Sequence, residues 1–255
     1  FVRSSQRKYC ETSKIQARMS IVKAEGIVIK GFKYGESSKI ITIFSRDFGK
    51  FTALVKSTRN IKSKTSGVFD NLNHISVIFN KKDSGDLQFI NKGECINSFS
   101  RIKTDLDKLS SAFRMLELVN HATHDYDTNE ELFDLASSCL TSLNKCERNS
   151  GNYLLYFQAN LTRLMGIKPD LVEDTPLPGA DKKETFNPAN ALKLSRKEYP
   201  IVNSLFDKGL DFTGNMVLHR NELEKIGNMF DHYLSNHLEK FGFLKTKSVM
   251  YELKN

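Results

Sequence analysis

Residues 26–56 decide the fold, and they read GIVIKGFKYGESSKIITIFSRDFGKFTALVK. Runs of β-branched and aromatic residues at 27–29, 40–44 and 51–55 favour β-strands. The segment RDFG at 46–49 separates the last two runs and is typical of a hairpin turn. The stretch therefore predicts a meander of short strands.

Strand signals continue on both sides of this stretch. An apolar pair at 21–22 precedes Gly26, and a glycine between two apolar runs predicts a bulge or a sharp bend. Two further runs, ISVIF at 75–79 and LQFI at 87–90, are joined by the turn-rich segment 81–86. About five short strands fit a small barrel of the OB type, although a strand count alone leaves an SH3-like barrel open.

After about residue 100 the spacing of apolar residues changes from two to about 3.6, which is the helical period. The sequence TNEE at 128–131 is a capping box that predicts the start of a helix. Gly166, followed by Pro169, is typical of a helix end. Apolar faces predict helices around 106–116, 132–143, 153–164 and 223–237.

The chain is thus predicted to be an α+β protein with two domains. Residues 19–98 are expected to form a five-stranded OB-type β-barrel. Residues 99–255 are expected to form an α-helical domain, with an extended, proline-rich loop at about 168–194. Residues 1–18 precede Met19 and lack the apolar core of a signal peptide, so they are predicted to be a disordered tail or an addition to the native chain.

Hydrophobic runs and cysteines indicate the cellular compartment of the protein. No apolar run approaches the roughly 18 residues that cross a membrane, which predicts a soluble protein without a membrane partner. The four cysteines include no close C-x-x-C pair. Free thiols are therefore expected, in a reducing cytoplasm.

Positive charge is concentrated at the amino-terminal side. Residues 1–66 contain 15 Lys and Arg against 4 Asp and Glu, a balance of +11, whereas the remainder contains 23 against 26, a balance of −3. A basic module on a near-neutral body predicts a polyanionic partner, and nucleic acid first. A basic surface that only confers solubility is the alternative.

The candidate DNA-binding residues are cations of the predicted barrel and one aromatic residue. Cations neutralise phosphates without reading sequence, and the dense cluster from Lys56 to Lys64 follows a strand in a segment too polar to be buried. Tyr34 is the residue expected to stack on a base, because Phe48 and Phe51 suit core or turn packing better. The candidates are Lys30, Lys33, Tyr34, Lys39, Lys50, Lys56, Arg59, Lys62 and Lys64.

Motifs of catalysis are missing from the sequence. There is no phosphate-binding Gly-x-x-x-x-Gly-Lys loop, no paired-carboxylate signature and no nucleophile motif. His121 and His124 could share a metal ion, but no third ligand is near them in the sequence. We therefore predict that the protein is not an enzyme and that it needs no cofactor or metal.

The order of the motifs resembles the RecO family of bacterial DNA repair proteins. GIVI at 26–29, YGESSKIITIFS at 34–45 and KSTR at 56–59 are similar to the amino-terminal signature of the family, although Ser57 replaces its usual glycine. YLSNHL at 233–238 and FGFLKTKS at 241–248 are similar to its carboxy-terminal ending. The resemblance covers nearly everything from Met19 onward.

The resemblance implies a recombination mediator of the cytoplasm, associated with the nucleoid. Such proteins bind single- and double-stranded DNA, anneal complementary strands and, with RecR, help load RecA on strands coated by single-stranded-DNA-binding protein, whose acidic C-terminal tail they bind. Many members carry a four-cysteine zinc site after a Gly-x-x-Pro turn, but residues 172–194 contain no Cys or His, so no zinc is expected. A nucleic-acid-processing enzyme that grips its substrate with the barrel, and a structural adaptor without DNA function, are the alternatives.

Overall fold

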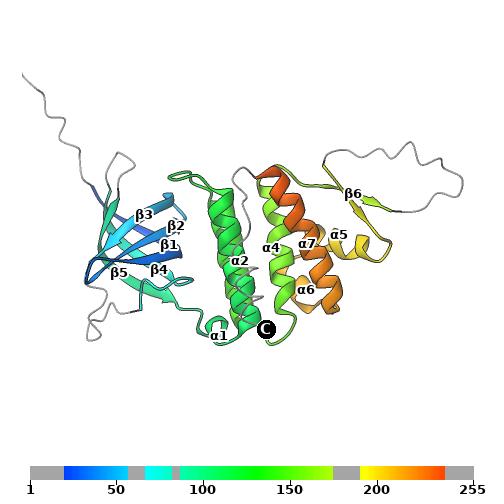
Figure 1. Cartoon of the computed structure of the whole chain (residues 1–255), viewed down its shortest axis with the longest axis horizontal. Helices are drawn as coiled ribbons and strands as arrows, with labels where there is room; N and C mark the ends of the chain where they lie inside the picture. The colour runs from blue at the N-terminus through cyan, green and yellow to red at the C-terminus, as the bar shows by residue number, and fades with distance from the viewer. Residues whose placement is uncertain (1–19, 57–66, 82–86, 175–189, 239–255) are drawn as a thin grey trace, which may run out of the picture.

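The computed structural model describes residues 20–56, 67–81, 87–174 and 190–238. Within these ranges the chain first forms strands and then helices, and the two parts lie next to each other along the long axis of the molecule (Figure 1). The strands of the first part are β1 (Ser20–Tyr34), β2 (Ser38–Ser45), β3 (Gly49–Val55), β4 (His74–Lys81) and β5 (Gln88–Asn97).

The five strands form an OB-like barrel in the order β1-β2-β3-β5-β4. β1 pairs antiparallel with both β2 and β4, while β3 and β5 pair in parallel. Inward-facing apolar residues fill the interior, where the rings of Phe51 and Phe79 stack with their centroids 4.8 Å apart. The predicted five-stranded OB-type barrel, followed by helices, is confirmed.

β1 runs through Gly26 without a register shift, so the bulge predicted there is wrong. Gly26 pairs in register with Ser45 on β2 and with Ile75 on β4, and the register shift lies further along, between Val28 and Lys30. Neighbouring strands lie so close that a Cβ atom on Gly26 would be 2.4 Å from a side-chain carbon of Ile43. The glycine allows this close approach.

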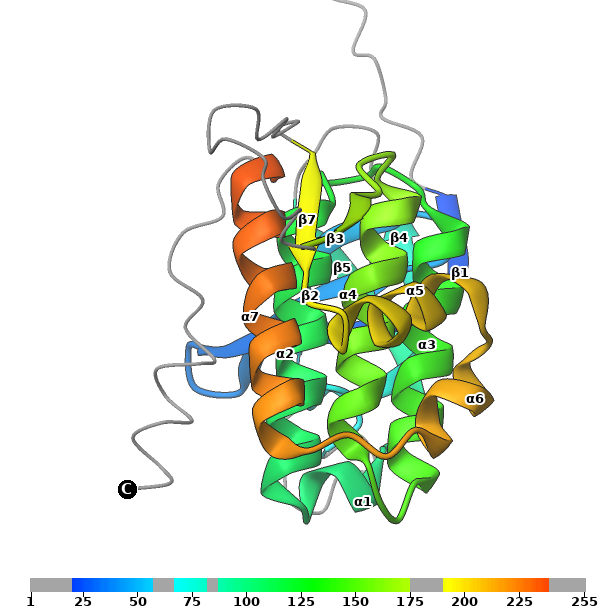
Figure 2. The same cartoon turned by 90° about the vertical axis from the view of Figure 1, so that its right-hand side faces the viewer.

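The helical part is built around α4, which contacts α2, α3, α5, α6 and α7 (Figure 2). The four long helices lie where the apolar faces predicted them. The side chain of Asn129 accepts the N–H of Leu132, so α3 begins one residue later than the predicted capping box. The helices are α1 (Ser100–Lys103), α2 (Leu106–Ala122), α3 (Glu130–Lys145), α4 (Ser150–Leu164), α5 (Glu198–Asp207), α6 (Leu210–Asn215) and α7 (Arg220–His237). None of these helices is long and apolar enough to cross a bilayer.

Two short parallel strands, β6 (Asp170–Glu173) and β7 (Ala191–Leu194), lie within the segment that was predicted to be an extended loop. Leu192 and Leu194 of β7 are buried in a core that α5 and α7 share. Each strand has only four residues and pairs with a partner about twenty residues away, so no local pattern could indicate them. Residues 175–189 lie outside the described part of the chain.

One apolar core joins the barrel to the helices. Ile27, Ile29 and Phe44 on the outside of the barrel belong to the same buried cluster as residues of α2, α3 and α4. The ring of Phe44 contacts that of Phe133 on α3, with centroids 5.9 Å apart. The barrel is therefore packed against α2 and α3 by the same burial of apolar surface that stabilises a domain interior.

The carboxyl end of α2 is capped by a lysine of the barrel. The ammonium group of Lys50 donates to the carbonyl oxygens of Asn120 (2.9 Å) and Thr123 (2.7 Å). Helix ends leave such carbonyls unpaired, and a cation there also complements the helix dipole. The N–H of Tyr126 donates in turn to the carbonyl of Lys50 at 2.8 Å. These bonds fix β3 against the end of α2.

The hairpin turn between β2 and β3 lies against the segment that leads into α3. Gly49 has a φ of +64°, and a Cβ atom on it would be 2.2 Å from the carbonyl oxygen of Asp127. Arg46 of the same turn binds Asp134 at 3.0 Å and Glu130 at 2.9 Å. The hydrogen bond from Arg46 lowers the pKa of the Asp134 carboxyl. The turn thus contacts α3 through Arg46, and next to Asp127 it leaves no space for a Cβ atom on Gly49.

Replacing Phe44 by alanine should destabilise the protein by about 3–5 kcal/mol, because the change leaves a cavity in the core shared by the barrel and α3. Phe32→Ala is the matched control, since Phe32 lies on the same barrel but is 56% exposed. The control should change the free energy of unfolding by less than about 0.5 kcal/mol. Urea denaturation followed by circular dichroism measures both variants, and equal losses would contradict the shared core.

Replacing Gly49 by alanine should destabilise the protein more than replacing Gly35. Both glycines have positive φ, so both variants carry the strain of a left-handed side chain, roughly 1–2 kcal/mol. A Cβ atom on Gly35 meets nothing within 4 Å, whereas one on Gly49 collides with the backbone of Asp127. Thermal unfolding of the two variants isolates the effect of the collision. Identical midpoints would show that the turn does not press on this segment.

Candidate nucleic-acid interface

Three candidates from the sequence are exposed together at one end of the barrel: Lys33, Tyr34 and Lys56. Lys33 and Tyr34 form the end of β1, where the chain turns into β2. Lys33 pairs in register with Lys39, and Lys39 pairs with Val55, the residue before Lys56. We call this surface, formed by Lys33, Tyr34, Lys39 and Lys56, the hairpin end.

A second aromatic side chain lies beside Tyr34. Phe32 is two residues before it on β1, and side chains two apart lie on the same face of a strand. Their exposed fractions are 56% for Phe32 and 54% for Tyr34, which is large for such side chains. Sequence reasoning missed Phe32, although the alternation along β1 could have indicated it. Phe48 packs edge-on against Phe79 and is no exposed platform.

Two of the candidate cations have partners inside the protein. Lys39 donates to the carbonyl of Phe69 at 2.7 Å and pairs with Asp70 at 3.3 Å. Lys50 caps α2, and its side chain is only 12% exposed. Both lysines thus stabilise the fold, which the sequence pattern did not indicate. Their contact with DNA stays a prediction.

The remaining candidates in the basic cluster are Arg59, Lys62 and Lys64. They lie in residues 57–66, outside the described part of the chain, as do residues 1–19 and the carboxy-terminal motif after Leu238. Lys56 is the residue at which the described chain reaches this cluster. Lys56 therefore belongs both to the hairpin end and to the predicted basic cluster.

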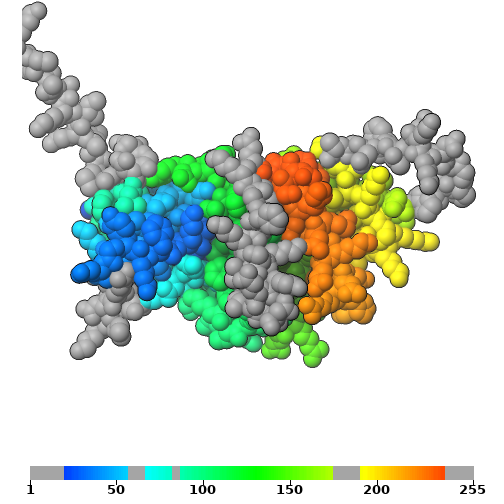
Figure 3. Space-filling model, viewed as in Figure 1, coloured from blue at the N-terminus to red at the C-terminus, as the bar shows by residue number. Residues whose placement is uncertain are grey.

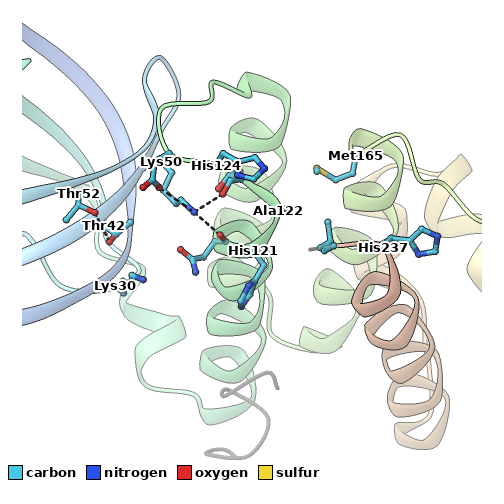
Figure 4. Close-up of a pocket in the computed structure, with 13 residues that line it drawn as sticks. Lys30, Thr42, Lys50, Thr52, His121, Ala122, His124, Met165 and His237 are labelled. Carbon is cyan, nitrogen blue, oxygen red and sulfur yellow. Dashed lines mark hydrogen bonds and ion pairs between the residues drawn. The ribbon is translucent and has the colours of Figure 1, made fainter. Parts of the chain in front are cut away.

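A cleft of about 620 Å³ lies between the barrel and the helices (Figure 4). Its barrel side includes Lys30, the remaining candidate, which is exposed. Its helical side consists of the carboxyl ends of α2, α4 and α7. We call it the barrel–helix cleft, and its lining residues are Lys30, Thr42, Lys50, Thr52, Asn120, His121, Ala122, Thr123, His124, Asp125, Met165, His237 and Leu238.

The cleft brings together the two histidines that the sequence singled out. Burial lowers the pKa of the His121 imidazole, and the nearby positive charges of Lys50, Arg114 and Lys30 act in the same direction, while Glu117 opposes them. The lowered pKa leaves His121 mainly neutral at pH 7. Among the described residues no group of three or more His, Cys, Asp or Glu side chains could hold a metal ion.

Several curated DNA repair proteins are similar to this chain. The DNA repair protein RecO of Chloroherpeton thalassium is 26% identical over an alignment of 257 residues, which covers 91% of this chain and 99% of that protein. The protein of the same name from Prosthecochloris aestuarii is 28% identical over 203 residues, covering 79% and 74%. That of Chlorobium limicola is 31% identical over 151 residues, covering 59% and 58%.

Family models match both parts of the structure. The model described as "Recombination protein O N terminal" matches residues 19–99, which contain the barrel. The model described as "Recombination protein O C terminal" matches residues 103–247, which contain all helices from α2 to α7. The resemblance of the sequence motifs is thereby confirmed, and the chain belongs to the recombination protein O (RecO) family.

Proposed function

We propose that this protein is a non-catalytic recombination mediator that binds single- and double-stranded DNA on its barrel and anneals complementary strands. The observation that carries the proposal is the hairpin end, where the exposed cations Lys33 and Lys56 lie within the same short stretch of the barrel as the exposed rings of Phe32 and Tyr34. Lys33 points to the opposite face of β1 from the two rings, so a strand at this end meets cations and rings on both sides of the hairpin. Cations next to exposed aromatic rings are the combination with which barrels of this type hold a nucleic-acid strand.

Lys33 and Lys56 are available to phosphates. Within the described part of the chain neither of them forms an ion pair with a carboxylate. Each lysine that binds a phosphate releases counterions, so binding needs no sequence and weakens steeply with salt. Tyr34 and Phe32 can stack on bases, and each stacked base contributes roughly 1–3 kcal/mol.

Annealing follows from these two properties. Two complementary strands repel each other through their phosphates, and cations on one surface offset this repulsion while the bases pair. Once the bases are paired, they no longer stack on Tyr34 and Phe32, and only the salt-sensitive phosphate contacts hold the duplex. Such a surface brings strands together without a nucleotide, a metal or a covalent step.

The proposal includes the partners that membership of the family suggests. They are RecR, the acidic C-terminal tail of single-stranded-DNA-binding protein and, indirectly, RecA. The protein would act in the cytoplasm, at the nucleoid. The candidate cations Lys30, Arg59, Lys62 and Lys64 would extend the DNA surface beyond the hairpin end, to which Lys39 already belongs. Lys50 would contact DNA at the place where it holds the barrel on α2.

The variant Lys33→Ala/Lys56→Ala should anneal complementary oligonucleotides several-fold more slowly, because two phosphate contacts are lost. The slope of log binding constant against log salt concentration should become less negative by about 1.4 for a single strand, or about 0.7 per contact. The matched control is Arg196→Ala/Lys197→Ala, which removes two exposed cations beside α5, at the opposite end of the molecule from the barrel (Figure 3). Annealing rates over a salt series, followed by fluorescence quenching, measure both.

Each alternative has its own outcome in this assay. Equal slopes and rates for the two double variants would remove the hairpin end as the DNA surface. Absence of any salt-dependent DNA binding would point to a structural adaptor. Shortened oligonucleotides after incubation with a divalent metal would point to a nucleic-acid-processing enzyme.

A further inference from the structure

The barrel–helix cleft lies on the face of the barrel that OB folds commonly use for ligands. Lys30, Thr42 and Thr52 form one row across β1, β2 and β3, since Lys30 pairs with Thr42 and Thr42 with Thr52. The two threonine hydroxyls are 3.5 Å apart. The face of strands 2 and 3 binds oligonucleotides in OB folds. Here that face lines the cleft opposite the helices (Figure 4).

The helical wall of the cleft favours hydrogen-bond donors over phosphates. The carboxyl ends of α2, α4 and α7 contribute residues to it, and such helix ends carry partial negative charge. Lys50 neutralises the end of α2 through its two carbonyl bonds and its ion pair with Asp125 at 3.7 Å. The wall also includes the imidazoles of His121 and His124.

Unpaired bases fit this chemistry, and paired bases do not. The amino groups of adenine, cytosine and guanine are donors, and in a duplex they face the partner strand and the grooves. Proteins that recognise single strands bind such unpaired edges directly. A cleft of about 620 Å³ has the volume of a site for a drug-sized molecule, which corresponds to roughly one or two nucleotides and is far too small for a duplex.

The cleft is continuous with the hairpin end. Lys30, Phe32 and Tyr34 alternate on one face of β1, so Lys30 is four residues from Tyr34, about 13 Å along the strand. A single strand stacked on Tyr34 and Phe32 can therefore reach Lys30 with its next phosphates. Beyond Lys30 its bases come to the row of Thr42 and Thr52.

We propose that the barrel–helix cleft is a subsite for unpaired bases, and that it makes the protein prefer single strands over duplex. In this subsite Lys30 holds a phosphate at the rim, and His121 and His124 contact the base from the helical side. Duplex DNA contacts only the hairpin end. Pairing removes the base edges from the cleft, so the annealed product loses these contacts and dissociates more readily. The inference rests on the proposed DNA binding and adds a second binding surface to it.

The test compares the affinity for a cytosine-rich single strand with that for a duplex of the same length. His121→Ala/His124→Ala should raise the dissociation constant for the single strand about fivefold and change that for the duplex less than about twofold. The matched control is His232→Ala, an exposed histidine of α7 outside the cleft, which should change neither. Fluorescence anisotropy measures the binding, and circular dichroism checks that the variants are folded.

Two further variants separate the cleft from the hairpin end. Thr52→Val removes a hydroxyl of the barrel wall with little change of shape, and it should also weaken single-strand binding selectively. Lys33→Ala/Lys56→Ala should weaken single strand and duplex alike. If it does so while the histidine and threonine variants affect both DNAs equally or neither, the cleft proposal is wrong and the proposed function stands. If no variant changes binding to either DNA, the proposed function fails as well.

Discussion

The apolar core between the barrel and the helices is the constraint on which the other features depend. Ile27, Ile29 and Phe44 point outward from the barrel, and they leave water only because α2 and α3 cover them. Burial of such side chains is worth roughly 1.5–3 kcal/mol each, so the barrel is held in one position against the helices. In a separate barrel the same residues would form an exposed apolar patch.

That fixed position shapes the candidate site. Next to the apolar core, the barrel face and the end of α2 do not touch along their whole length. The barrel–helix cleft lies between them. Lys50 bridges this distance and gives the unpaired carbonyls of α2 a cation. The hairpin end projects beyond the helices and keeps Lys33, Tyr34 and Lys56 in solvent. Residues that hold the barrel on the helices and candidate DNA-binding residues thus lie on the same three strands, β1, β2 and β3.

The fold could be predicted from the sequence wherever the signal is local. The strand runs of the barrel, the apolar faces of the four long helices and the left-handed Gly166 at the end of α4 are examples. Contacts between distant residues could not be predicted. Lys50 and Asn120 are 70 residues apart, so the sequence shows a cation but not the carbonyl that it caps. The parallel pairing of β6 with β7 also joins residues that are distant in the sequence, so it could not be predicted either. Phe32, in contrast, could have been found from the alternation along β1.

The most direct test of DNA binding at the hairpin end is photo-crosslinking of a single-stranded oligonucleotide that carries 5-iodouracil, with the attachment sites mapped by mass spectrometry. Crosslinks on Tyr34 and Phe32 are expected, because both rings are exposed at the hairpin end. Phe212 on α6 is an internal comparison, since it is similarly exposed but far from the barrel (Figure 1). Crosslinks on Phe212 and none on the end of β1 would contradict the account.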